Sequence, residues 1–455
     1  MTRLALHLND ADITLSNGEQ VTYREPGFAY LGADNLTTGN AAFTHSRIDP
    51  RRIQHRYWSE LDTAPLPDSR FSHLSAADLV SRQLEQLWEP RGKDVDELVV
   101  AVPAYMSTAN LGLFLGIASE LSLPVVALVD AAVASTRREY KGAVPVHVDL
   151  GLHKASLTRL AQPGMAQTDR IEVIDNAGLY ALHDIWLTTI AEAFVRKSRF
   201  DPLHTAETEQ MLLNRLRGWL REASRHDSVK MEVEAGGTTY AAEIESLALI
   251  GAAAPVYQRI ESMLRSFYRA EDLPAIQVTD RVARLPGLTE MLKARVGGEV
   301  FVLEAGATAR GAFARCRGNA EAAGGVSLLR QLPWDQAAIE IGAHVVESSN
   351  SGAPTHLLHG HRAYEIGNSP LILGSQDGGD DRFVALATDM PGVSRRHCSL
   401  ANKNGQCVLE DHSRYGTFLN GHRIDGSSVL QAGDAMRIGS PGFEFKLITT
   451  DTANG

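Results

Sequence analysis

The sequence has 455 residues, of which 44% are hydrophobic and 22% are charged. A chain of this length and composition is expected to form two or three soluble globular domains. Its net charge of −11 argues against a nucleic-acid partner, and its three cysteines are too few for a disulfide framework.

The remaining global features point to a cytoplasmic protein. The most apolar region, residues 111–129, is interrupted by Glu120 and Pro124 and does not predict a membrane-spanning helix. No apolar signal-peptide segment follows Met1. We therefore expect no membrane insertion.

Strands and helices alternate in the first 150 residues. Apolar residues at three- and four-residue spacing predict helices, and unbroken apolar runs predict buried strands. We expect a hairpin over 4–15, helices at 76–88 and 107–121, and strands at 97–103, 123–129 and 144–150. This alternation is typical of an α/β fold.

The chain continues with longer helices and then loosens. We expect helices around 182–194, 212–220, 249–268 and 288–296, a hairpin over 229–240, and strands at 275–279 and 299–303. Glycine and serine then become frequent, which predicts a linker over 321–354.

Several motifs in residues 1–320 occur in a familiar order. They are Val100-Ala-Val-Pro-Ala-Tyr105, Asp130-Ala-Ala-Val-Ala134, Asp149-Leu-Gly151, Arg284-Leu-Pro-Gly-Leu288 and Ala305-Gly-Ala-Thr-Ala-Arg-Gly-Ala-Phe-Ala314. This part resembles the nucleotide-binding domain of the seventy-kilodalton heat-shock chaperones, within the actin-like ATPase superfamily. The resemblance implies a two-lobed actin-like α/β domain and a cleft for Mg-ATP.

The residues that should hold the nucleotide depart from that family. Its glycine-rich hairpins let backbone N–H groups approach phosphate closely. Here the first hairpin is His7-Leu-Asn-Asp-Ala-Asp12, which lacks glycine, and Gly151 is followed by Leu152-His-Lys154. We therefore predict a degenerate site and a pseudo-ATPase without a cofactor. Its vestigial residues are Asp10, Asp130, Asp149, Gly151 and Lys154.

Residues 355–450 show short apolar segments separated by turn residues, which predicts a β-sandwich. Asn404-Gly405 between two apolar runs predicts a hairpin. The region resembles the forkhead-associated (FHA) domain, a reader of phosphothreonine peptides. The matching motifs are Leu371-Ile-Leu-Gly374, Val393-Ser-Arg-Arg-His397, Leu409-Glu-Asp-His-Ser413, Gly416-Thr-Phe-Leu-Asn-Gly421, Gly433-Asp434 and Ile438-Gly439.

The FHA resemblance implies a binding site on two loops. The expected contacts to phosphopeptide or partner are Ser394, Arg395, Arg414, Ser375 and Thr417, and the expected structural supports are Gly374, His397, Asn420 and Gly421. Relatives place an arginine that grips phosphate where this chain has Ser375. Loss of one charged hydrogen bond, about 1.5–3 kcal/mol, predicts weaker binding unless Arg395 or Arg414 compensates.

The leading hypothesis is a non-catalytic cytoplasmic adaptor: a degenerate actin-like scaffold whose FHA domain docks a protein partner phosphorylated on threonine. A second hypothesis is an active chaperone-like ATPase, in which Asp149 holds Mg²⁺ and Lys154 contacts phosphate. A third is an assembly subunit in which both sites are silent. An unphosphorylated partner remains an alternative for the FHA domain. No metal site is expected.

Overall fold

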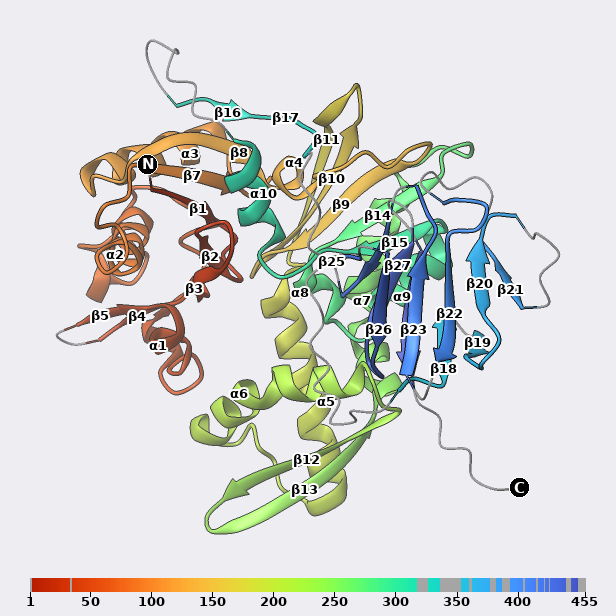
Figure 1. Ribbon diagram of the computed structural model, residues 1–455. Helices are drawn as coiled ribbons and strands as arrows, with labels where there is room; N and C mark the ends of the chain where they lie inside the picture. Colours follow the sequence, from red (N-terminus) through yellow and green to blue (C-terminus); the bar gives the residue numbers. More distant parts are fainter. Residues whose placement is uncertain are drawn as a thin grey trace. The chain divides into compact units, whose positions relative to one another are not determined.

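The computed structural model describes most of the chain, which divides into two compact units, Met1–Asp335 and Gln336–Gly455. Each unit is considered by itself (Figure 1). The described residues are 2–32, 35–316, 326–335, 353–359, 362–376, 382–386, 393–403, 406–414, 416–420, 422–424, 426–438 and 443–448. No helix within these ranges is both long and apolar enough to cross a membrane.

The first unit contains a six-stranded sheet in the order β16-β8-β7-β1-β2-β3. Its strands β1, β2 and β3 form an antiparallel meander, and β7 and β8 continue parallel to β1. The bounds are β1 (Arg3–His7), β2 (Ile13–Ser16), β3 (Val21–Glu25), β7 (Glu97–Val102), β8 (Val125–Asp130) and β16 (Leu328–Leu329). Apolar residues of α2 (Ala76–Trp88) and α3 (Thr108–Glu120) share one hydrophobic core with this sheet.

A second sheet repeats this arrangement in the order β15-β14-β9-β10-β11-β17. Strands β9, β10 and β11 form the antiparallel meander, and β14 and β15 run parallel to β9. The bounds are β9 (Val144–Leu150), β10 (Lys154–Ala161), β11 (Met165–Asp175), β14 (Pro274–Val278), β15 (Glu299–Val302) and β17 (Gln331–Pro333). Between the two sheets lie α4 (Ala131–Ser135) and α10 (Ala307–Arg315), whose alanines pack closely against both (Figure 1).

The remaining elements of the first unit are helices and two smaller sheets that are separate from the six-stranded ones. A long hairpin of β12 and β13 projects beyond α5 and α6 (Figure 1). The bounds here are α5 (Leu179–Ser198), α6 (Ala206–Ala223), β12 (Ser228–Ala235), β13 (Thr238–Glu245), α7 (Ser246–Arg265), α8 (Asp280–Ala283) and α9 (Leu288–Val296). Near the N-terminus lie β4 (Ala29–Leu31), β5 (Leu36–Thr38), α1 (Gly39–Phe43) and β6 (Ile53–Gln54).

Residues 326–335 form a strap that belongs to the first unit, although we expected a linker to begin at residue 321. Within it, β16 pairs with β8 of the first sheet and β17 pairs with β11 of the second. Leu332 is buried, and Asp335 forms an ion pair with Arg137. One short segment therefore completes an edge of each sheet.

The second unit contains two sheets packed around a common apolar core. Their orders are β19-β18-β28-β27-β24-β25 and β21-β20-β22-β23-β26. The bounds are β18 (His356–His359), β19 (Arg362–Glu365), β20 (Leu371–Gly374), β21 (Phe383–Ala385), β22 (Cys398–Lys403), β23 (Gln406–Asp411), β24 (Thr417–Leu419), β25 (His422–Arg423), β26 (Ser427–Leu430), β27 (Ala435–Ile438) and β28 (Phe443–Ile448). Lys403 pairs with Gln406, as the expected hairpin requires, while its two turn residues lie outside the described ranges.

Candidate functional site

Two loops of the second unit carry most of the residues expected to bind a partner. The first loop, residues 393–397, precedes β22, and the second, residues 412–416, connects β23 to β24. The end of β20 is bonded to the first loop, because the backbone N–H of Ser375 donates to the carbonyl oxygen of Ser394 at 3.1 Å. The Ser375 side chain is half-buried beside this contact.

Gly374 allows the first loop to lie directly against β20. A Cβ atom at this position would be 1.9 Å from the carbonyl oxygen of Arg395 and 2.7 Å from its carbonyl carbon. Backbone atoms cannot move aside as a flexible side chain can, so any larger residue would displace the loop. Gly374 therefore lies where β20 and the first loop approach each other closely.

The buried imidazole of His397 joins the two loops. Its Nδ1 accepts a hydrogen bond from the backbone N–H of Ser394 at 3.1 Å, and its Nε2 faces the carbonyl oxygen of Gly416 at 3.2 Å. This pattern places the proton on Nε2 of a neutral ring. Burial lowers the pKa of His397 below 6.5, although the Gly416 carbonyl and the Asp411 charge act in the opposite direction.

Ser394 lies at the meeting point of the loops. Its side-chain oxygen accepts a hydrogen bond from the backbone N–H of Arg414 at 3.2 Å, and the residue is half-buried. A hydroxyl that accepts one bond keeps its own proton to donate. Ser394 is thus held so that its O–H can donate to an acceptor at the surface.

Asp411 accepts hydrogen bonds that hold the second loop in place. Its Oδ1 accepts hydrogen bonds from the backbone N–H of Ser413 at 3.0 Å and from the hydroxyl of Thr417 at 2.9 Å. Burial would raise the pKa of Asp411, but these hydrogen bonds outweigh it and the pKa is lowered. Thr417 is fully buried, so it braces the loop and does not make the ligand contact that we expected of it.

Asn420 supports a neighbouring turn. It adopts a positive φ of 50°, and its side chain bonds to Asp434 at 2.7 Å and to the backbone N–H of Ala435 at 2.9 Å. These bonds tie β24 to β27. Gly421, the other expected support here, lies outside the described residues.

Exposed guanidinium groups flank Ser394. Arg395 and Arg396 are exposed on the first loop, and Arg414 is exposed on the second. Guanidinium and hydroxyl donors carried on adjoining loops suit a phosphorylated side chain, because phosphate offers several strong acceptors.

Comparison with known families identifies this part of the chain. Residues 371–439 match the FHA domain. The match extends from β20 through β27 and includes both loops, and it covers no part of the first unit. No match to the chain was found among curated proteins. The FHA domain is a module of protein–protein interaction.

In the first unit, Asp149 at the end of β9 is enclosed by side chains. It accepts hydrogen bonds from Asn9 Nδ2 and Thr279 Oγ1, both at 2.7 Å, and Arg281 Nε lies 3.7 Å from its Oδ1. Burial would raise the pKa of Asp149, but the charge of Arg281 and the hydrogen bond from Thr279 lower it. The carboxylate is thus fully engaged within the protein.

The first hairpin docks against the segment that follows Asp149. The backbone N–H of Leu152 donates to Asp10 Oδ1 at 2.8 Å, and a Cβ atom on Gly151 would lie 2.4 Å from the same oxygen. Burial raises the pKa of Asp10 to about 6. The glycine expected to approach a nucleotide instead approaches a carboxylate of the same chain.

The two other residues expected at a vestigial nucleotide site have separate contacts. Asp130 caps α4 by accepting bonds from the backbone N–H groups of Ala132 and Val133, and its burial raises its pKa. Lys154 forms an ion pair with Asp175 across β10 and β11 at 3.2 Å. The structure therefore brings Asp10, Asp149 and Gly151 together, with Asp130 and Lys154 engaged elsewhere.

The space near Asp149 is filled by His7 of the first hairpin and by two residues that follow β14, none of which was among the predicted site residues. His7, Thr279 and Arg281 line a cavity of only about 10 Å³, which is about the minimum for one water molecule. His7 is buried, and burial and the charge of Arg281 lower its pKa to about 3. The sequence signal for His7 was its place at the start of the first hairpin, which was predicted to replace a glycine-rich turn. Within the described part of the chain, no group of three His, Cys, Asp or Glu side chains could hold a metal ion.

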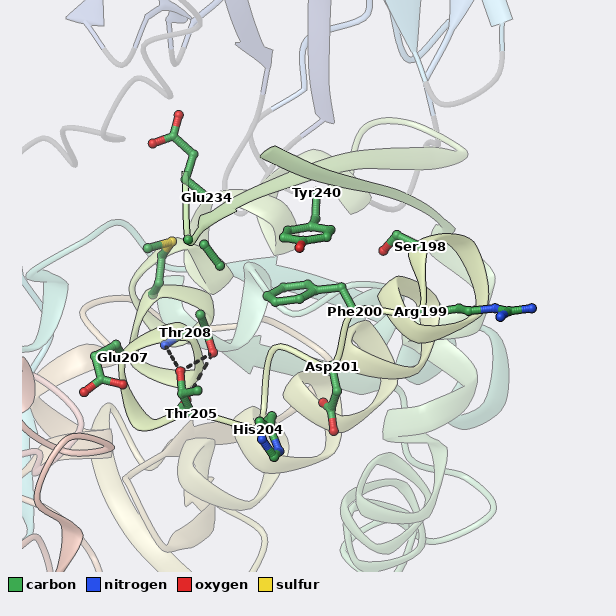
Figure 2. A pocket seen from close by; sticks show the side chains of 13 residues that line it. Ser198, Arg199, Phe200, Asp201, His204, Thr205, Glu207, Thr208, Glu234 and Tyr240 are labelled. Carbon is green, nitrogen blue, oxygen red and sulfur yellow. Dashed lines mark hydrogen bonds between the residues drawn. The ribbon is translucent and has the colours of Figure 1, made fainter. Parts of the chain in front are cut away.

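An open hollow of about 650 Å³ lies between the end of α5, the start of α6 and the tip of the β12–β13 hairpin. At its centre the rings of Phe200 and Tyr240 stack with centroids 4.0 Å apart. Figure 2 shows that Asp201, Glu207 and Glu234 direct their carboxylates away from this pair. These three carboxylates therefore do not converge on one position where a ligand could bind.

Proposed function

We propose that this chain is a recognition protein, an adaptor whose FHA domain docks a protein partner phosphorylated on threonine. The observation that carries the proposal is the fixed position of the Ser394 hydroxyl between two loops that His397 holds together. Ser394 then donates to the phosphate, and the guanidinium of Arg395 supplies positive charge beside it.

The serine at position 375 has a consequence for affinity. Its backbone is bonded to Ser394 and its short side chain cannot replace a guanidinium. One missing charged hydrogen bond costs about 1.5–3 kcal/mol, or about tenfold to a hundredfold in affinity. We therefore propose that binding is weak for a single phosphothreonine, and that Ser375→Arg strengthens it.

Fluorescence anisotropy with an oriented library of phosphothreonine peptides tests this proposal on the full chain. Saturable binding that is lost with unphosphorylated peptides and in Ser394→Ala is expected. The matched control is Ser428→Ala, which changes a serine on β26 that pairs with Leu409 of β23 and belongs to neither loop. Equal binding of phosphorylated and unphosphorylated peptides would contradict phosphate recognition and favour a partner without phosphate.

We further propose that the first unit is a scaffold of actin-like fold that does not hydrolyse ATP. The repeated strand order of its two sheets supports the fold. The lack of hydrolysis is supported by Asp149, which is enclosed by Asn9, Thr279 and Arg281, and by the cavity of about 10 Å³ beside it. A nucleotide ordinarily occupies a pocket of some 300 Å³ or more.

Calorimetric titration with Mg-ATP, together with a phosphate-release assay, tests the proposal that the first unit does not hydrolyse ATP. Neither micromolar binding nor turnover above background is expected. Turnover that disappears in Asp149→Ala but persists in Asp175→Ala would overturn the proposal, because Asp175 is an exposed carboxylate at the end of β11 that pairs with Lys154.

A further inference from the structure

A second cavity of the first unit is lined by an unusual number of arginines. It measures about 60 Å³ and lies between β3, α6 and α8. A water molecule needs about 10–15 Å³ measured in this way, so the cavity accommodates a group of roughly four to six heavy atoms. Its cationic residues are Arg24, Arg217, Arg221, Arg281 and Arg284.

Three of these arginines share three carboxylates. Arg24 pairs with Asp12 and, at 3.3 Å, with Asp280, which also pairs with Arg284. Arg281 forms an ion pair with Asp149, in which Nε of Arg281 lies 3.7 Å from Oδ1 of Asp149. These charges balance one another.

Arg217 and Arg221 add positive charge that is not balanced. They are four residues apart on α6, both are exposed, and neither forms an ion pair with a described carboxylate. The consequence is visible at Arg284, where burial and the charges of Arg24, Arg217 and Arg221 lower the pKa to about 10. The cavity thus carries an excess of about two positive charges.

Buried polar atoms also lack hydrogen-bond partners among the described residues at this point. Arg281 lines both this cavity and the neighbouring one of about 10 Å³, it is 9% exposed, and its Nε has no hydrogen-bond partner among the described residues. His7, which is 3% exposed and lines the smaller cavity, has an Nε2 that is likewise unpartnered within the described ranges. Buried polar atoms are nearly always satisfied in proteins, by other protein groups, by water or by a ligand.

We propose that the arginine-lined cavity binds inorganic phosphate as the monohydrogen phosphate dianion. Two unbalanced guanidinium charges match a dianion, and the planar donor fork of arginine suits phosphate oxygens. Asp12 also lines the cavity, and its carboxylate accepts a hydrogen bond from the P–OH of monohydrogen phosphate. Sulfate has no such proton. The site is independent of the FHA loops.

Calorimetric titration of the full chain with inorganic phosphate at constant ionic strength tests the proposal. We expect one saturable site per chain, binding sulfate at least several-fold more weakly. Arg217→Gln combined with Arg221→Gln should weaken phosphate binding by about tenfold or more. Because both side chains are exposed on α6, this variant should fold, and its far-ultraviolet circular dichroism checks that it does.

Matched controls distinguish binding in this cavity from binding elsewhere on the chain. Arg225→Gln changes an exposed arginine just beyond α6 that does not line the cavity, and it should leave binding unchanged. Loss of binding in Ser394→Ala would instead place the phosphate at the FHA loops. The proposal is overturned by that result, by phosphate that does not saturate, by sulfate that binds equally, or by Arg225→Gln weakening binding as much as the double variant. ATP or ADP without Mg²⁺ binding more tightly than phosphate, with loss in the double variant, would reassign the cavity to a nucleotide.

Discussion

The backbone N–H of Ser394 donates to Nδ1 of His397 at 3.1 Å, so the proposed phosphate donor is held by a buried ring. His397→Ala would leave this N–H and the Gly416 carbonyl without partners. We expect the FHA domain to lose about 2–4 kcal/mol of unfolding free energy, measured by urea denaturation. His412→Ala, at an exposed histidine bonded to Ser399, should cost less than about 1 kcal/mol. Similar losses in both variants would contradict the bracing role.

Gly374 provides a test of loop position. Gly374→Ala places a Cβ against the backbone of Arg395, so the first loop must shift. We expect a stability loss of about 2 kcal/mol or more and weaker peptide binding, measured by denaturation and anisotropy. In Gly367→Ala the new Cβ meets only the end of the Arg382 side chain at 3.0 Å, and both properties should change little. An intact peptide affinity in Gly374→Ala would show that binding does not need this loop position.

Asp10 should destabilise the first unit at neutral pH. Its folded pKa of about 6 exceeds the unfolded value of 3.8, so ionisation above pH 6 costs the fold about 3 kcal/mol. The cost disappears as the pH falls from 6 towards 3.8. Asp10→Asn should therefore raise stability at pH 8 and raise it less at pH 5, as urea denaturation can measure. A large loss at pH 8 would instead indicate that the negative charge is needed, for example by a bound cation.

His55 and His153 should make the first unit sensitive to acid. His153 Nε2 lies 3.0 Å from both Nδ1 and the carbonyl oxygen of His55, and burial lowers their pKa values to about 4 for His153 and about 3 for His55. The unfolded chain takes up these protons near pH 6.5, so stability is fully present above pH 6.5 and falls below it. In this range the unfolding free energy falls by about 1.4 kcal/mol per pH unit for each of the two histidines.

The variant His55→Gln should reduce this slope between pH 6.5 and 4. His204→Gln, at an exposed histidine of the same unit, is the control and should leave the slope unchanged. Denaturation series at several pH values provide the measurement. An identical slope in wild type and His55→Gln would contradict the prediction that buried His55 makes the first unit sensitive to acid.

The strap of residues 326–335 should contribute to the stability of the first unit, which a flexible linker would not do. Leu332→Ala should lower the unfolding free energy of the first unit by about 2–5 kcal/mol, because Leu332 is only 3% exposed. Gln331→Ala changes the exposed neighbour on the same strand and should have almost no effect. Equal stability of the two variants would mean that the strap behaves as a linker.

Much of the fold follows from patterns that the sequence displays openly. The helix expected over 76–88 has these bounds, since Ser75 caps it and its apolar residues recur at helical spacing. The hairpin at residues 398–411 follows from one Asn-Gly pair between apolar runs. By contrast, β10 and β11 were not expected, because their exposed face carries charged residues such as Arg159 and Arg170 and no long apolar run.

The site was less predictable than the fold. Motif spacing indicated the loops that hold Ser394 and Arg414, yet it could not tell that the Thr417 side chain turns inward to Asp411. The strap was not predicted, because strands of two and three residues are too short to show an alternation of apolar and polar residues. Arg217 and Arg281 are far apart in sequence, and only the tertiary fold brings them to one cavity.

The strap has a consequence for how the chain is made. Synthesis proceeds from the N-terminus, so strands β8 and β11 leave the ribosome long before β16 and β17, which cover them. Until residue 335 has emerged, one edge of each sheet presents unpaired backbone groups to any other strand nearby. Exposed edges of this kind promote aggregation. A chain that stops at residue 320 would keep both edges open permanently, and such a fragment should aggregate where one that extends to residue 335 stays dispersed.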